Sequence, residues 1–249
     1  MPDAANRKPT IQHLAQQLRR LERTAQSTQP EGERLSTGIP VLDDLLPERG
    51  IPPGTLIEWL SDGAGVGAGT LAFTVAAHVM PENGVCVVID PGRSFYPPAI
   101  RLRSRAGPQG RGLERVIVVH PAGDRDALWA LEQSLRCCGV AVVVCRLGHL
   151  HGHVYRRLQL AAETGGGVGL LLRPVEYRSQ PSWADVRVLI EPQADTSNSV
   201  GRRLRVELIH CRGRGIGGTA ELVIDDETGD VRLAPQLAVA TDSIRAAGA

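Results

Sequence analysis

The sequence predicts an α/β protein with a doubly wound, mainly parallel central sheet and added antiparallel strands in its C-terminal part. Three observations support this class. A hydrophobic strand, Thr55–Leu60, leads into a glycine-rich loop and then into a helix, Leu71–Met80. Apolar strands and helices then alternate, which is typical of right-handed β-α-β units. Beyond Trp183 the strands follow one another without helices between them.

The elements of the alternating part are predicted in chain order. The strands after the loop are short and apolar on both faces, as central parallel strands are, and span Val85–Asp90, Arg115–His120, Val140–Arg146 and Val168–Arg173. The helices between them span Tyr96–Ala106, Asp124–Cys138 and Gly152–Thr164. The strands after Trp183 span Val186–Glu191, Arg203–His210, Ala220–Ile224 and Val231–Leu233. We expect these last strands to extend the sheet as antiparallel strands, with a hairpin turn at Asp226–Asp230.

The chain of 249 residues has room for one large domain with flanking segments. We expect an N-terminal helix and linker in residues 1–34, a core domain in 35–234 and a C-terminal tail in 235–249. The N-terminal helix carries one narrow apolar stripe, formed by Ile11, Leu14, Leu18 and Leu21. Because so short a helix is marginal in water, the stripe must pack on its own domain or on a neighbouring subunit.

Composition narrows the class of protein. Hydrophobic residues make up 42% of the chain and charged residues 22%, with a formal net charge of +1. No global field therefore attracts nucleic acid or membrane. The start of the chain lacks the apolar core of a secretory signal, and no apolar run is long enough to span a bilayer. Most of the five cysteines lie in or beside apolar strands, so we expect a cytoplasmic protein with reduced, buried thiols.

The glycine-rich loop is the first candidate site. A strand that feeds such a loop into a helix start aims backbone N–H groups at one point, which suits a phosphate. A working phosphate loop reads G-x-x-x-x-G-K-[ST], but here the second glycine is Ala68 and the lysine is Gly69. The only lysine of the chain is Lys8. The candidate residues of this degenerate nucleotide site are Gly63, Gly65, Gly67, Gly69 and Thr70.

The segment before this strand carries a family resemblance. It contains a Ser-Thr-Gly turn at Gly38, a Leu-Asp-Asp-Leu-Leu helix ending at Leu46 and a Gly-Ile-Pro-Pro-Gly turn ending at Gly54. This leader resembles the RecA superfamily, whose phosphate-loop ATPase core assembles on DNA. The chain resembles in particular the ImuA-like proteins of bacterial translesion synthesis, which three later stretches support: Arg157–Glu163, Gln180–Arg187 and Arg205–Gly213. The resemblance covers roughly residues 35–234 and implies a RecA-like version of the predicted sheet.

The resemblance also identifies two lost catalytic positions. The catalytic glutamate of the superfamily falls at Gly92, and the magnesium-associated aspartate that ends the Walker B strand falls at Cys145. Phosphoryl transfer depends on positioning and charge stabilisation, so losing the lysine, the base and the metal carboxylate removes most of the catalysis. We therefore expect a protein that is not an ATPase and needs no cofactor, although ATP binding at the loop remains open.

The resemblance implies a non-catalytic accessory protein in error-prone translesion synthesis. The implied partners are a RecA-like protein, an ImuB-like polymerase homologue and an error-prone polymerase subunit. The implied interface consists of the N-terminal stripe together with Arg212 and Arg214. The segments that correspond to DNA-binding loops are short here, although one contains Tyr177 and Arg178, so we expect DNA contact to be indirect.

Three alternatives to a non-catalytic adaptor remain open at this stage. The first is a nucleotide-binding ATPase or switch that uses the degenerate loop. The second is a Rossmann-type dinucleotide enzyme, because Gly63, Gly65 and Ala68 also fit G-x-G-x-x-A, with Asp90 ending the next strand. The third is a metal site formed by Cys145, His149, His151 and His153.

Overall fold

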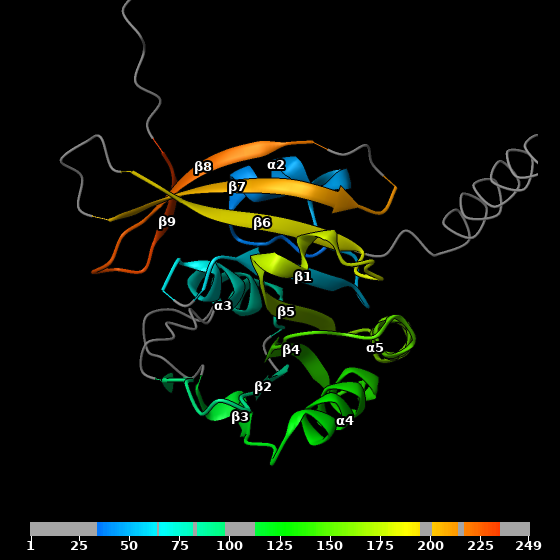
Figure 1. The fold of residues 1–249 in the computed structure, drawn as a ribbon. Coiled ribbons are helices and arrows are strands. Elements are labelled where there is room, and N and C mark those ends of the chain that lie inside the picture. The colour runs from blue at the N-terminus through cyan, green and yellow to red at the C-terminus, as the bar shows by residue number, and fades with distance from the viewer. Residues whose placement is uncertain are drawn as a thin grey trace, which may run out of the picture.

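The structure is a computed structural model, and it describes residues 34–63, 65–81, 84–97, 113–194, 201–213 and 217–234. Its centre is a nine-stranded sheet in the order β3-β2-β4-β5-β1-β6-β7-β8-β9 (Figure 1). The strands are β1 Leu56–Ser61, β2 Val85–Ile89, β3 Val116–Val119, β4 Val140–Arg146, β5 Val168–Pro174, β6 Val186–Gln193, β7 Arg202–Cys211, β8 Thr219–Ile224 and β9 Val231–Leu233.

The helices connect and cover these strands. The α-helices are α2 Pro40–Leu45, α3 Ala68–Val79, α4 Asp124–Arg136 and α5 Gly152–Gly165. Short 3-10 turns lie at η2 Pro47–Arg49, η4 Leu113–Arg115 and η5 Val175–Ser179. The predicted strands and helices after the glycine loop are found within a few residues of their expected ends, except the helix Tyr96–Ala106. Most of that helix lies outside the described residues, and Tyr96 itself is not helical.

The sheet confirms the predicted fold class and corrects one detail. The six strands from β3 to β6 pair in parallel, and β7, β8 and β9 pair antiparallel. We expected all strands after Trp183 to be antiparallel, but β6 is parallel to β1. The segment from Pro174 to Asp185 carries the chain back across the sheet, so a crossover occurs there without an α-helix.

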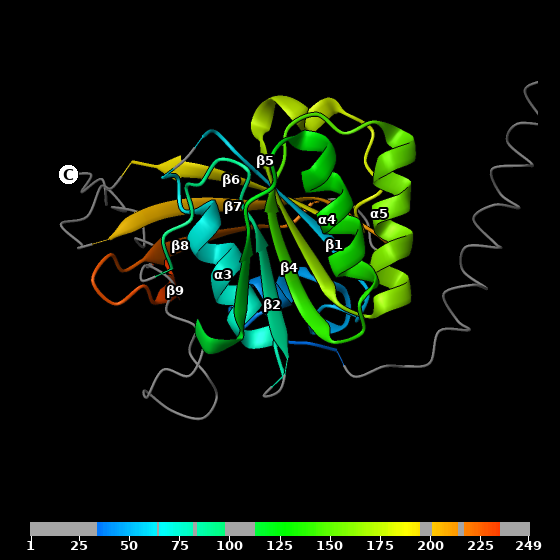
Figure 2. The ribbon, with the colours of Figure 1, turned by 90° about the horizontal axis from the view of Figure 1, so that it is seen from below.

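Two apolar layers enclose the parallel strands because side chains on a strand alternate between its faces. One layer packs α2 and α3 on one face and includes Val142 and Val144 of β4. The other packs α4 and α5, which lie side by side in Figure 2, and includes Val143 and Cys145. No helix among the described residues is long and apolar enough to span a membrane.

The leader before β1 forms a compact turn that is held by one carboxylate. The Asp43 carboxylate, which is only 8% exposed, accepts hydrogen bonds from Ser36 Oγ at 2.7 Å and from the Thr37 backbone N–H at 2.8 Å. Gly38 has a φ of 75°, and a Cβ there would lie 2.1 Å from the His78 ring of α3. The Ser-Thr-Gly signal therefore fixes how the leader packs on the helix that follows the glycine loop.

Candidate functional site

The glycine loop lies at the carboxyl end of β1, where it leads into the N-terminus of α3. Gly63, Gly65 and Gly67 have φ values of 86°, 88° and 104°, which favour glycine. Gly67 also lacks room for a side chain, because a Cβ there would lie 2.7 Å from Leu204 Cδ1 of β7. A Cβ on Gly69 would meet nothing within 4 Å. The antiparallel strands therefore constrain one end of the loop, while the position of the missing lysine is open.

The loop borders a cavity of about 620 Å³ and a smaller recess of about 110 Å³. Thr70 from the first turn of α3, Arg146 from the end of β4 and Arg202 from the start of β7 line both spaces. The rings of Phe73 and Phe95, with centroids 5.4 Å apart, form part of the apolar wall of the larger cavity. The site therefore combines backbone amides, one hydroxyl and two arginines.

Arg202 ties the loop to the hairpin between β8 and β9. Its Nη1 donates a hydrogen bond to the Gly65 carbonyl at 3.0 Å, and its Nε pairs with Asp226 Oδ1 at 2.6 Å. Arg146 is exposed and makes no ion pair within the described part of the chain. One arginine of the site thus holds the loop in place, and the other is available to an anion.

The carboxylates around the cavity serve mainly to hold turns. Asp90, which is 5% exposed at the end of β2, accepts the backbone N–H groups of Ser94 at 3.1 Å and Phe95 at 2.8 Å. Asp225 accepts the N–H groups of Thr228 and Glu227, and these hydrogen bonds lower the pKa of its carboxyl group. These two acids are therefore poorly placed to hold a metal ion on a phosphate.

The structure corrects our placement of the Walker B position. Cys145 lies on the face of the sheet that packs on α4 and α5, and burial raises the pKa of its thiol to about 12. The loop lies on the other face, where α3 packs, and the residue of β4 that reaches it is Arg146. Because neighbouring residues of a strand face opposite sides, an offset of one residue placed the wrong side chain at the site. Arg146 therefore places a cation beside the loop.

The other two residues that the family resemblance places at catalytic positions are glycines. Gly69 lies beside Thr70 at the start of α3, and Gly92 is exposed in the turn that follows β2. Neither the charge of a lysine nor a general base is supplied from these positions. The loop glycines and Thr70 line the recess and are in place to contact a phosphate.

The Rossmann alternative is wrong. Dinucleotide-binding sheets place the first strand between the second and fourth strands. Here β1 lies between β5 and β6. The Asp90 carboxylate that would bind a ribose is occupied by the turn to Ser94 and Phe95.

The proposed metal site is also wrong within the described residues, where no group of three or more His, Cys, Asp or Glu side chains is arranged to hold a metal ion. Cys145 is buried on the α4 and α5 side of β4, whereas His149, His151 and His153 are exposed. The three imidazole rings do lie together: centroids of His149 and His151 are 4.8 Å apart, and those of His151 and His153 5.8 Å.

The predicted interface residues lie far from the loop or outside the described residues. Arg212 follows β7 at the end of the sheet opposite to the loop, and its Nη1 pairs with Asp185 at 3.0 Å and Glu163 at 3.4 Å. Burial raises the pKa of Asp185, and the charge of Arg212 opposes that shift. Arg214 and the N-terminal stripe of Ile11, Leu14, Leu18 and Leu21 lie outside the described residues.

A buried ion cluster within the sheet was not predicted from the sequence. Glu58, in the middle of β1, is fully buried and pairs with Arg173 of β5 and Arg187 of β6, each at 2.5 Å. Arg173 Nη2 also donates to the Gly148 carbonyl at 2.9 Å, and Arg187 Nη2 to the Tyr177 carbonyl at 3.2 Å. The signal in the sequence was a single acid inside an otherwise apolar strand.

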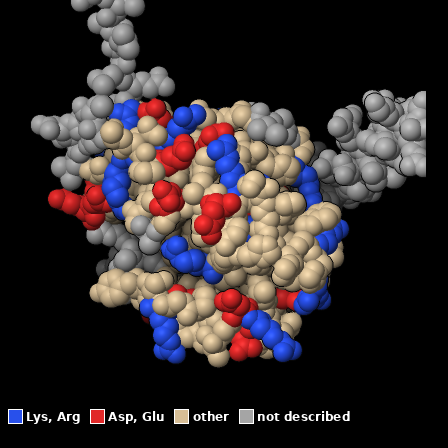
Figure 3. Space-filling view, in the orientation of Figure 1, with Lys and Arg blue, Asp and Glu red and all other residues tan. Residues whose placement is uncertain are grey.

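Charge on the visible face is mixed, with acidic and basic side chains interspersed (Figure 3).

Comparison with solved structures finds a similar fold. The crystal structure of the RadB recombinase superposes with a TM-score of 0.60 at 17% sequence identity, covering 81% of this chain and all of that one. This likeness concerns the fold alone. Together with the glycine loop at the carboxyl end of β1, it defines an α/β protein with a RecA-like core.

Comparison with curated sequences finds a similarity in sequence. No family model matches the chain. The chain is 29% identical over 204 residues to Protein ImuA of two Caulobacter vibrioides strains, covering 74% of this chain and 81% of that protein. The chain is thus similar in sequence to ImuA, and its core has a RecA-like fold.

Proposed function

We propose that this chain is a non-catalytic accessory protein in an SOS-type DNA damage response and in error-prone translesion DNA synthesis. The similarity to ImuA and the RecA-like fold support a role in this process. We propose that it acts through contacts with a RecA-like protein, an ImuB-like polymerase homologue and an error-prone polymerase subunit. Its contact with DNA would then be indirect.

The observation that carries the non-catalytic part of this proposal is the composition of the loop cavity. The open position at Gly69 offers no cation to the phosphates, and Arg146 stands where β4 reaches the cavity. A magnesium ion beside Thr70 would therefore face a guanidinium group instead of a carboxylate, which disfavours the metal that phosphoryl transfer requires. The Arg202 guanidinium is already bonded to the Gly65 carbonyl and to Asp226, so it does not replace the lysine.

We propose that the contact with the RecA-like protein uses the N-terminal stripe and the region around Arg212 and Arg214. Arg212 is 42% exposed at its side chain even though it pairs with Asp185 and Glu163. The two carboxylates hold the Arg212 side chain in place while part of it stays accessible to a partner.

Binding of the purified chain to a RecA-like protein of the same cell tests the adaptor function. We would measure complex formation by biolayer interferometry for the wild type and for a double variant of the stripe, Leu14→Glu with Leu18→Glu. The matched control places the same two charges on predicted polar positions, Gln16→Glu with Gln17→Glu. The proposal expects binding that the stripe variant loses and the control keeps. Equal binding by both variants would refute the stripe, and no binding by the wild type would refute this partner.

A nucleotide-responsive switch is the second candidate. It is favoured by the left-handed glycines and Thr70, which still border a cavity of about 620 Å³. Such a switch would bind ATP without turning it over. Calorimetric titration with ATP, with and without magnesium, tests it: heat that is lost in Thr70→Ala supports the switch, and the absence of heat rejects it.

A further inference from the structure

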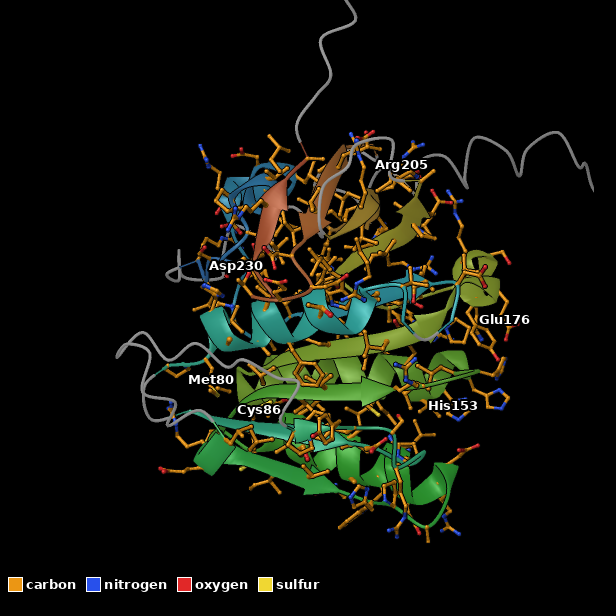
Figure 4. The ribbon with its side chains drawn as sticks, turned by 90° about the vertical axis from the view of Figure 1, so that its left-hand side faces the viewer. Met80, Cys86, His153, Glu176, Arg205 and Asp230 are labelled. Carbon is orange, nitrogen blue, oxygen red and sulfur yellow. The ribbon has the colours of Figure 1, made fainter. Side chains whose placement is uncertain are left out.

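Another surface lies at the carboxyl ends of β4 and β5. The imidazoles of His149, His151 and His153 form a row, and the His149 ring meets that of Tyr177 edge-on at a centroid distance of 6.2 Å. In Figure 4, His153 and Glu176 lie at the same end of the molecule. None of these rings lines the cavity at the glycine loop.

The row continues along α5 to a cation and a tryptophan. Arg156 lies one helical turn after His153, so the two side chains are neighbours on the helix surface. The Arg156 guanidinium lies 4.8 Å from the centre of the Trp183 ring, which remains 45% exposed. We call these six residues the imidazole–tryptophan patch: His149, His151, His153, Arg156, Tyr177 and Trp183. Tryptophan, tyrosine and arginine are the residues that most often dominate protein interfaces.

The buried ion cluster holds this patch in a fixed shape. Arg173 donates to the Gly148 carbonyl and stacks on the Tyr177 ring at 4.8 Å. Gln180 Nε2 donates to the Leu150 carbonyl at 2.7 Å, which joins the two loops that carry the patch. A preformed surface loses less entropy when it binds a partner than a flexible loop does.

The charge of the patch favours an anionic partner. The N-terminus of α5 points its positive end here, with no side-chain cap and no acid in its first turn. The nearby carboxylate of Glu176 hydrogen-bonds to Tyr177, and Arg178 pairs with Glu207 at 3.6 Å. Arg156 is thus the one permanent cation of the patch that has no carboxylate partner among the described residues. A nucleic acid strand needs several such cations along its phosphates, whereas a short acidic peptide does not.

We propose that the imidazole–tryptophan patch binds an acidic segment of a partner protein, with carboxylates on the imidazoles and Arg156 and an apolar side chain against Trp183. This inference rests on the proposed function as an adaptor, because it gives one partner contact its chemistry. It needs neither the N-terminal stripe nor the glycine loop.

Fluorescence anisotropy with defined probes tests this inference. The probe is a short dye-labelled peptide of glutamates with interspersed leucines, and the control probe replaces each glutamate with glutamine. A single-stranded oligonucleotide of similar length is the third probe. The variants are the triple change His149→Gln, His151→Gln and His153→Gln, and the single change Arg156→Gln. The matched control is Arg125→Gln, an exposed arginine of α4, and urea unfolding checks that each variant is folded.

We expect the wild type to bind the acidic peptide and not its glutamine version. Each patch variant should lower the affinity for the acidic peptide by about tenfold, and Arg125→Gln should lower it by less than about twofold. Undiminished peptide binding by the folded patch variants would overturn the proposal, as would no binding of the acidic peptide or tighter binding of the oligonucleotide. The peptide assay contains no RecA-like protein and no ATP. Its outcome is therefore independent of the binding experiment with the stripe variants, and a failure of either proposal can be told from a failure of the other.

Discussion

The middle of β1 and the loop at its end differ in how their charges are paired. In the middle of β1, Glu58 is fully buried and is matched by Arg173 and Arg187. At the end of β1, the glycine loop faces a cavity where Arg146 has no carboxylate partner among the described residues and Gly69 leaves the lysine position empty. The interior charges therefore balance one another, whereas the cation of Arg146 beside the loop is not balanced by an ion pair in the described part of the chain.

The difference indicates what the fold maintains. Burying ions is costly, so the Glu58 cluster persists only if its geometry and hydrogen bonds are nearly complete. It fixes the loops after β4 and β5, which carry the imidazole–tryptophan patch. The glycine loop keeps its backbone conformation because Gly67 packs against β7 and Arg202 anchors Gly65. Contacts in both regions therefore hold the backbone in a fixed conformation.

The largest expected effect comes from breaking the complete region. Glu58→Gln should destabilise the fold by roughly 3–5 kcal/mol, because it leaves two arginines in the interior without a carboxylate. Urea unfolding measures the change. Glu48→Gln, which removes an exposed partner of Arg34, is the control and should change stability by less than about 0.5 kcal/mol. A Glu58 variant as stable as this control would show that the cluster is not structurally required.

Two alanine substitutions separate the packed end of the glycine loop from its open position. Gly67→Ala should destabilise the fold by about 1–3 kcal/mol, because its φ is 104° and its Cβ would meet Leu204. Gly69→Ala should be neutral or stabilise α3 by up to about 1 kcal/mol, because it lies inside the helix with open space around it. Thermal unfolding measures the stability of both variants. Equal changes would contradict the distinction between a packed end of the loop at Gly67 and an open position at Gly69.

Restoring the phosphate-loop motif tests how the glycine loop limits ATP binding. The double change Ala68→Gly with Gly69→Lys rebuilds G-x-x-x-x-G-K-T, and open space around Gly69 accommodates the new side chain. ATP should bind about tenfold more tightly than to the wild type, which corresponds to about 1.4 kcal/mol. Turnover should remain absent, since Arg146 still stands in place of a metal-binding acid. Calorimetry measures the binding, and turnover by this variant would contradict the account.

The smallest effect concerns pH. Burial, with the charges of Arg187 and Arg212, lowers the pKa of His210 in the folded protein below its ordinary value of 6.5. The unfolded chain therefore binds more protons below that value, and the contribution of His210 to stability is lost as the pH falls. Asp185, whose pKa is raised, acts in the opposite direction at more acidic pH. His210→Gln should flatten the stability profile below pH 6.5 in urea unfolding, and an unchanged profile would refute the assignment.

The elements of the fold could be predicted because their signals are local. The apolar run Thr55–Leu60 and the alternation after it correspond closely to β1 and the strands and helices that follow. The left-handed glycines of the loop were also readable as a strand-to-helix turn. The antiparallel extension was predicted from the absence of helices, but the parallel pairing of β6 depends on where Pro174–Asp185 crosses the sheet.

The details of the candidate site could not be predicted because they depend on face and strand order. An offset of one residue on β4 exchanged the buried Cys145 for Arg146, which faces the loop. Arg202 is more than a hundred residues from Gly65 in sequence, and only the order β1-β6-β7 brings them together. Glu58 was visible as one charge in an apolar strand, but its two arginines come from other strands.

Hydrolysis of ATP by the purified wild-type protein tests the central claim most directly. The assay would follow phosphate release with magnesium present, with Thr70→Ala as the control for contaminating activity. The account predicts no release above that of the Thr70→Ala protein, because the loop has no lysine at Gly69 and Arg146 faces the cavity. Release by the wild type that Thr70→Ala abolishes would show an active ATPase and contradict the account.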